Sequence, residues 1–197
     1  MSTSRRTSLP VQYVIQAPNF QKLAEVLPKF LEEALHVPTA QAGLLSGFAF
    51  WATLIGQLSG GVLSDRLVLR VRGVRPLLMG VPYLLAAPAL WAMAAVDRVP
   101  VVMIAWSLAM IARGFAEPNI YGTVIDSVSA HERGAAQGFM LCGTFVGASL
   151  GTLVTGKVID VAGYGTAIPA LALIAALSGA LGTALCLYLR RRAPRAA

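Results

Sequence analysis

Charge is scarce in this sequence of 197 residues, and so are cysteine and histidine. Asp, Glu, Lys and Arg make up 13% of the residues and hydrophobic residues 56%, whereas a soluble domain carries about 25% charged residues. The two cysteines, Cys142 and Cys186, both lie inside apolar runs, where they are expected as small packing residues, so the sequence supports neither a disulfide framework nor a metal site. Residues 1–10 are polar and basic, without the apolar core of a cleavable signal peptide. The composition therefore predicts an integral membrane protein with neither a bound metal nor another cofactor.

The distribution of positive charge argues against nucleic acid as a partner. A net charge of +7 would suit a phosphate-binding surface, but the arginines do not gather on one amphipathic face. They lie in the gaps between long apolar runs, where Lys and Arg mark the loops that stay on the cytoplasmic side of a membrane. The partner that this pattern predicts is the lipid bilayer.

Five apolar runs are long enough to cross a bilayer. A hydrocarbon core of about 30 Å takes about 20 helical residues at 1.5 Å each. The runs cover about residues 39–64, 76–96, 101–125, 134–159 and 166–189. The sequence thus predicts an all-α integral membrane protein.

The stretch before these runs, residues 11–37, is amphipathic. Apolar residues recur at helical spacing, and Lys22, Glu25 and Lys29 are among the polar residues on the other side. Such a helix either lies on the membrane or crosses it with its polar side toward a water-filled cavity. We expect a crossing, which gives five clear and one amphipathic transmembrane helix. The six-helix domain then covers residues 11–189, between a disordered cytoplasmic start (1–10) and a basic cytoplasmic tail (190–197).

The arginines also orient the chain. Of the 13 arginines, 11 fall in the start, in the tail and in the two loops that follow the 39–64 and 101–125 runs. Arg98 in an outer turn and Arg113 within a span are the exceptions. Because positively charged loops stay inside, both termini are expected in the cytoplasm, provided that the first segment crosses. The expected location is a bacterial inner membrane.

The arginine-rich connection at residues 60–76 resembles a known signature. Its matching positions are Gly61, Asp65, Arg66, Gly73 and Arg75, and they are similar to the loop that joins helices 2 and 3 of major facilitator superfamily transporters. Residues 67–72 separate Asp-Arg from the glycine, a longer spacing that is closer to the family's second-half version between helices 8 and 9. The alternative is a generic basic loop of a polytopic membrane protein.

Arg113 and Glu117 stand one helical turn apart in an otherwise apolar span. A charge in lipid costs at least about 2.5–3.5 kcal/mol, so each needs water or a partner, and at this spacing they can pair with each other. The surrounding sequence resembles the region between the fourth and fifth, or tenth and eleventh, helices of the same family. The matching positions are Arg113, Gly114, Glu117, Pro118, Tyr121, Asp126, Arg133 and Gly134, whereas Ser129 stands where proline is usual.

The resemblance and the topology place these groups toward the cytoplasmic end and imply contacts of a gate. Coupling to substrate or proton, and plain solvated helix ends, stay open as alternatives. In the family, the carboxylate that matches Asp65 steadies the inner gate. We expect Asp65 to face the start of the fifth span near Gly134, where the N-terminus of a helix favours an anion.

Glycines in the 134–159 run predict close helix packing. Gly143, Gly147 and Gly151 share one helical face and let two helices approach closely. Gly138, Gly147 and Gly151 also resemble a glycine motif on the fifth helix of exporters in the family. Thr152 stands where that motif has a proline, so the resemblance does not establish that this chain exports its solute. Ser149 completes a Gly-x-Ser-x-Gly pattern without a histidine base in the same span, which leaves an intramembrane enzyme as the least supported function.

The resemblance also indicates which residues meet the solute. The family's first and seventh helices line a central cavity, so the resemblance makes Lys22 and Glu25 candidates for contact with a solute or a coupling proton. Gln57, in the 39–64 run, is a further cavity candidate. The alternative for the first two is a surface helix on which Glu25 pairs with Lys29.

Taken together, the motifs resemble one six-helix half of a major facilitator transporter, more similar to the C-terminal half. A family member has two such halves with the substrate between them. The resemblance implies secondary transport of a small solute by alternating access, with a second half or a second copy of the chain as partner. A non-transporting membrane scaffold or an inactive remnant is the alternative.

Overall fold

The computed structural model of the chain describes residues 26–71 and 74–192. Residues 26–33 are helical, and the helices that follow are α2 (Thr39–Val68), α3 (Val74–Ala94), α4 (Val99–Ser127), the short 3-10 helix η1 (Ala130–Glu132), α5 (Arg133–Ala162) and α6 (Tyr164–Arg192). The described residues contain no strand. The expected disordered start, Lys22, Glu25, Gly73 and the last five residues of the tail lie outside the described residues.

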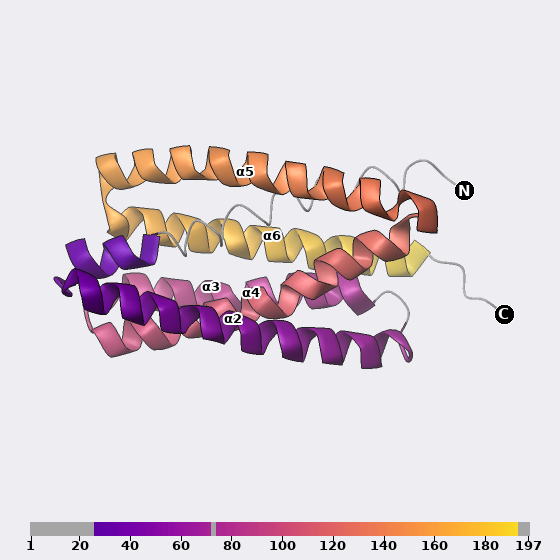
Figure 1. Ribbon diagram of the computed structural model, residues 1–197, viewed down its shortest axis with the longest axis horizontal. Helices are drawn as coiled ribbons and strands as arrows, with labels where there is room; N and C mark the ends of the chain where they lie inside the picture. Colours follow the sequence, from indigo (N-terminus) through magenta and orange to yellow (C-terminus); the bar gives the residue numbers. More distant parts are fainter. Residues whose placement is uncertain (1–25, 72–73, 193–197) are drawn as a thin grey trace.

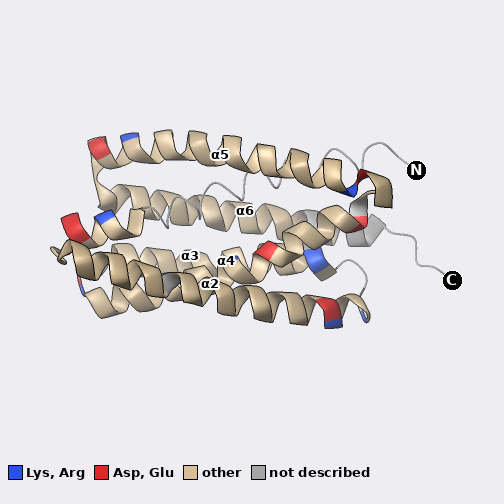
Figure 2. Ribbon diagram, viewed as in Figure 1, with Lys and Arg blue, Asp and Glu red and all other residues tan. Residues whose placement is uncertain are grey.

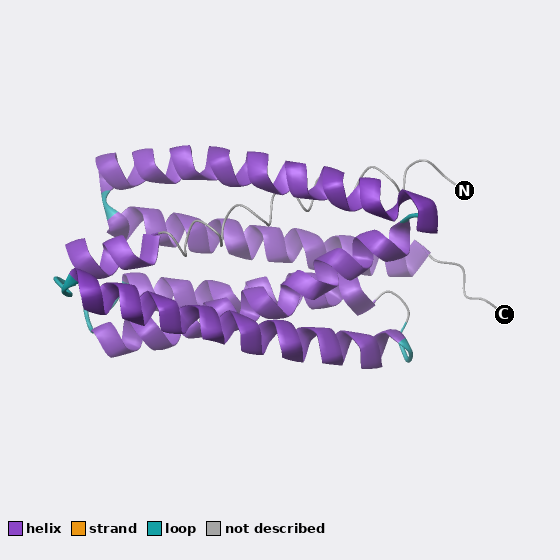
Figure 3. Cartoon of the chain, viewed as in Figure 1, coloured by secondary structure: helices purple, strands orange, loops and turns teal. Residues whose placement is uncertain are grey.

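The long helices run side by side and are joined by short connections (Figures 1 and 3). The α2–α3 and α4–α5 connections lie at one end of the bundle, together with the end of α6; we call this the arginine end. The α3–α4 and α5–α6 connections lie at the opposite end. Figure 2 shows that charged residues gather at both ends and are rare between them, as expected for helices that cross lipid.

The five predicted crossings are confirmed. Within the described residues, five helices are long and apolar enough to span a membrane. Two boundaries differ from the expectation in ways that matter. Helix α2 continues to Val68, so Asp65 and Arg66 lie in its last turns and not in a loop. Helix α6 continues to Arg192, so the expected tail begins within that helix. A basic residue in the last turn suits the negative end of a helix dipole. The crossing of the first segment stays a prediction, because Lys22 and Glu25 are not described.

Most of the buried core lies among α2, α3, α4 and α6. The α2–α4 contact is close because it is made by glycines: a side chain at Gly60 would meet the backbone of Phe115, and one at Gly114 would meet the Thr53 carbonyl. Gly80 and Gly179 do the same between α3 and α6. Small residues at helix contacts are the usual route to tight packing in membranes.

Helix α5 is the least embedded of the five. Its buried residues are Met140, Ala148 and Thr155, and large apolar side chains such as Phe139 and Leu153 are exposed. Of the glycines expected to pack, Gly143, Gly147 and Gly151 are half-buried, whereas a side chain at Gly138 would meet open space. A large part of α5 therefore faces outward from this chain.

Candidate functional site

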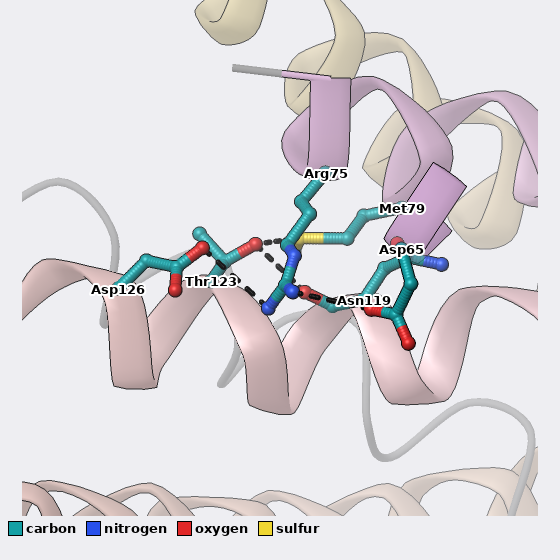
Figure 4. A network of polar contacts seen from close by, with 6 residues as sticks. All are labelled: Asp65, Arg75, Met79, Asn119, Thr123 and Asp126. Atoms are coloured by element: carbon teal, nitrogen blue, oxygen red, sulfur yellow. Dashed lines mark hydrogen bonds and ion pairs between the residues drawn. The ribbon is translucent and has the colours of Figure 1, made fainter. Parts of the chain in front are cut away.

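At the arginine end, one guanidinium links three helices. Arg75, in the first turn of α3, has its Nη2 3.5 Å from Oδ1 of Asp65 on α2. Its Nη1 lies 3.5 Å from Oδ2 of Asp126 near the end of α4. Figure 4 shows the arginine between the two carboxylates. The structure thus brings together three residues that the sequence motifs singled out separately.

The local packing explains where Arg75 points. Gly122 on α4 has no side chain at the place where the guanidinium passes; a side chain there would meet Nη1 of Arg75. Beneath it, Thr123 donates a hydrogen bond to the Asn119 carbonyl at 2.7 Å and lies 3.4 Å from the sulfur of Met79 (Figure 4). Sequence reasoning missed these four residues, because only the packing of α3 against α4 gives them a role.

Two polar atoms in this cluster are buried without a hydrogen-bond partner in the structure: Nε of Arg75 and Oδ1 of Asn119. One is a donor and the other an acceptor. An unsatisfied buried polar atom costs about 1–3 kcal/mol. The contact between α3 and α4 therefore has a free donor on α3, Nε of Arg75, and a free acceptor on α4, Oδ1 of Asn119.

The two ion pairs themselves contribute little to stability. The carboxylate side chains of Asp65 and Asp126 are 78% and 57% exposed, and both distances are 3.5 Å. Exposed pairs of this kind are worth about 0–1 kcal/mol each. The two pairs connect three helix ends at low energetic cost.

Other predicted residues at this end make fewer contacts. Asp65 makes its hydrogen bond with Arg75, and a side chain at Gly134 would meet open space. Arg66 and Arg133 are exposed, and Gly61 faces open space. Ser129, in place of the family's proline, donates its hydroxyl to Glu132 at 2.7 Å, and the same carboxylate accepts the Ser129 backbone N–H at 3.3 Å. This closes the turn that starts η1.

A second polar cluster lies deeper in the bundle. Arg113 is the middle residue of α4 (Val99–Ser127), and Glu117 is about 13 Å from the level of Asp126 at 1.5 Å per residue. The expectation that both lie toward the cytoplasmic end is therefore replaced by a position near the middle of the helix. Gln57 of α2 donates its amide to Oε2 of Glu117 at 2.8 Å.

The expected pairing of Arg113 with Glu117 is not found. Among the described residues, no hydrogen bond or ion pair to Arg113 is present, and the carboxylate of Glu117 is held by Gln57. The reason is that α2 and α4 approach closely at Gly60 and Gly114, which brings the Gln57 amide within reach of that carboxylate.

The face of α4 that carries these charges points into the bundle. Residues seven apart lie on the same side of a helix, so Arg113 and Glu117 follow Trp106 and Met110. Trp106 and Met110 belong to one buried cluster with Leu27 of the first segment. Both charged residues are half-buried, and Tyr83 and Tyr121 lie within electrostatic range of both.

At the opposite end, a tyrosine connects the first segment to the last helix. Tyr164, the first residue of α6, donates its hydroxyl to Oε2 of Glu33 at 2.6 Å. Its ring meets the ring of Phe30 edge-on, with the centroids 5.5 Å apart. Nothing in the sequence indicates this contact, because its partners are 131 residues apart.

Within the described part of the chain, no group of three or more His, Cys, Asp or Glu side chains could hold a metal ion. The fold and the two polar clusters define a multi-pass membrane protein with a charged contact between helix ends and a polar group at mid-depth. The family model for the Major Facilitator Superfamily matches residues 14–197, and the chain belongs to this family of secondary transporters. Its members move small solutes and are not enzymes.

A solved structure agrees with the fold. The crystal structure of a mutant of the peptide transporter POT in complex with alafosfalin superposes on 93% of this chain with a TM-score of 0.68 at 18% sequence identity. The match covers 38% of the length of that transporter, so it has the extent of a half-domain. No curated protein matches the chain.

Proposed function

We propose that this chain forms one half of a transporter that moves its solute by alternating access, with the arginine end as the cytoplasmic gate. Arg75 supports the proposal most directly, because its guanidinium connects α2, α3 and α4 through weak, exposed ion pairs. Contacts of that strength can be broken and remade at each turnover. The resemblance of the loop to the family's second-half version favours the C-terminal half.

The outer face of α5 supports a second half as the partner. Exposed apolar side chains and the open position at Gly138 leave this face without a partner among residues 26–71 and 74–192. A second six-helix half, or a second copy of the chain, would cover part of it. The solute pathway then passes Gln57, with Lys22 and Glu25 as further candidates and a proton as the coupling ion.

The orientation of the chain follows from its arginines. The arginine end carries Arg66, Arg70, Arg75 and Arg133, whereas the opposite end carries Arg98. By the positive-inside rule the arginine end lies in the cytoplasm. With a crossing first segment, both termini lie there too, in a bacterial inner membrane.

Water access at mid-depth tests the proposal. In a background of Cys142→Ser and Cys186→Ser, the variant Gln57→Cys is treated in membrane vesicles with a small, polar thiol reagent. A transport pathway predicts labelling at position 57, and the lipid-facing control Leu54→Cys should stay unlabelled. If position 57 were as unreactive as position 54, a non-transporting scaffold would be the better description.

A further inference from the structure

Two opposite charges share one face of α4 at mid-depth without pairing. Arg113 and Glu117 are one turn apart, yet among the described residues no ion pair joins them. In a membrane, each charge left without a partner costs at least about 2.5–3.5 kcal/mol on insertion scales. Arg113 has no partner among the described residues, and Glu117 is held through one oxygen by the neutral amide of Gln57. Neither charge is therefore balanced by an opposite charge of the chain, which suits a ligand that brings both.

Gln57 holds the carboxylate of Glu117 away from Arg113. Its amide donates to Oε2 of Glu117 at 2.8 Å and holds the carboxylate toward α2. The close approach at Gly56, Gly60 and Gly114 fixes the distance between the two helices. The hydrogen bond that Glu117 accepts from Gln57 ends on Oε2, so Oε1 is left for another donor.

We infer that Arg113 and Glu117 bind a small zwitterion that carries a carboxylate and an amino group. This rests on the proposed function, because it names the solute class of that pathway. The guanidinium of Arg113 takes the carboxylate of the solute through two parallel hydrogen bonds. The free oxygen of Glu117 accepts from the ammonium group. Tyr121, one turn beyond Glu117 on the same face, adds an aromatic ring near the cation.

Charge balance favours a zwitterion over a solute with one charge. A plain anion would satisfy Arg113 but would lie beside the uncompensated carboxylate of Glu117. A plain cation would leave Arg113 without a partner in the same way. A zwitterion compensates both charges and adds no net charge at the middle of the membrane, where charge is most costly.

Tryptophan fluorescence of the full chain in lipid nanodiscs can test this binding directly. Trp51→Phe and Trp91→Phe leave Trp106, which lies two turns from Arg113 on the same face. The probes are glycine, β-alanine and γ-aminobutyrate, each compared with the matching carboxylic acid and the matching amine. We expect at least one zwitterion to bind about tenfold more tightly than both of its single-charge analogues.

Two variants assign the two ends of the solute. Arg113→Gln should lower zwitterion binding to the level of the amine analogue, and Glu117→Gln should lower it to the level of the carboxylic acid. Arg98→Gln, at the opposite end of the bundle, removes the same charge as Arg113→Gln and should leave the preference intact. If a glutamine variant fails to fold, Arg113→Lys and Glu117→Asp keep each charge, and the preference for the zwitterion should survive in both.

The inference is overturned if no zwitterion is preferred over its analogues, or if the preference persists in both glutamine variants. A carboxylic acid that binds as well as the zwitterion and brings a proton to Glu117 would overturn it too. This outcome differs from failure of the proposed function. If position 57 is labelled but no zwitterion is preferred, the proposed transport function stands and the proposed solute class is wrong. If a zwitterion binds but position 57 is unreactive, the binding site stands and the proposed transport function is wrong.

Discussion

The guanidinium of Arg75 and the carboxylate of Asp126 lie 3.5 Å apart and join the start of α3 to the end of α4. Arg75 is 21% exposed and Asp126 57%, so the cation is the more enclosed partner. The guanidinium contacts Asp65 as well, through its other terminal nitrogen, and both carboxylates are exposed, so each ion pair is weak. The relationship therefore suits a contact that changes with conformation.

The first prediction compares Asp65 with a neighbouring arginine. Asp65→Asn removes one of the two charges that hold Arg75, whereas Arg70→Gln removes an exposed charge that makes no contact with this cluster. We expect Asp65→Asn to shift the balance between inward-open and outward-open states and Arg70→Gln to do little. The measurement is the rate of thiol labelling at Gln57→Cys from each side of oriented vesicles. Equal effects of the two changes would refute the role of Asp65.

The second prediction uses two adjacent glycines. Gly60→Ala places a methyl group against the backbone of Phe115 on α4, whereas Gly61→Ala places it in open space. We expect Gly60→Ala to destabilise the bundle by about 1–3 kcal/mol through overpacking. Gly61→Ala should be neutral or stabilise by up to about 1 kcal/mol, since alanine is the better helix former. Thermal unfolding in detergent measures both, and a Gly60→Ala protein as stable as the Gly61→Ala protein would show that α2 and α4 are not in close contact.

The third prediction concerns the opposite end. Tyr164→Phe removes the hydroxyl that Glu33 accepts and keeps the ring that meets Phe30. Because Glu33 is exposed, the loss should be about 1 kcal/mol or less. Limited proteolysis near residue 36 should speed up as the first segment loosens from α6. Glu32→Gln, one residue away and outside this contact, is the control, and it should leave the cleavage rate unchanged.

The fourth prediction concerns Lys22 and Glu25. If the first segment lines the pathway, Glu25→Cys should be labelled by a polar thiol reagent, and a bound zwitterion should slow that labelling. Lys22→Leu should impair uptake but leave insertion into the membrane intact, because removing a charge from a span makes insertion easier. Rapid labelling at position 25 that neither ligand nor a second half slows would place the segment on the membrane surface.

The sequence predicts the membrane-spanning helices well because the thickness of the bilayer sets their length. An apolar run must match the bilayer, so the bounds of α3 and α6 differ from the expected ones by only a few residues. The charged signature around Asp65 and Arg75 was also recognisable, since its residues lie within one short connection. These features depend on local composition and on spacing along the chain.

The missed features depend on contacts between distant residues. The spacing of Gly56 and Gly60 was visible and could have predicted a tight contact, but it does not name α4 as the partner. The bond from Gln57 to Glu117 overrides the local pairing with Arg113, because a neighbouring helix places a donor closer than the next turn does. The contact between Glu33 and Tyr164 has no local signal at all.

The central claim is that a solute pathway passes the mid-bundle cluster and is closed at the arginine end by Arg75. The most direct test is the ratio of labelling rates at Gln57→Cys from the two sides of the membrane, with and without Arg75→Gln. We predict that Arg75→Gln raises labelling from the arginine side by about tenfold or more relative to the opposite side. An unchanged ratio, with the protein still folded and inserted, would contradict the gate and the account built on it.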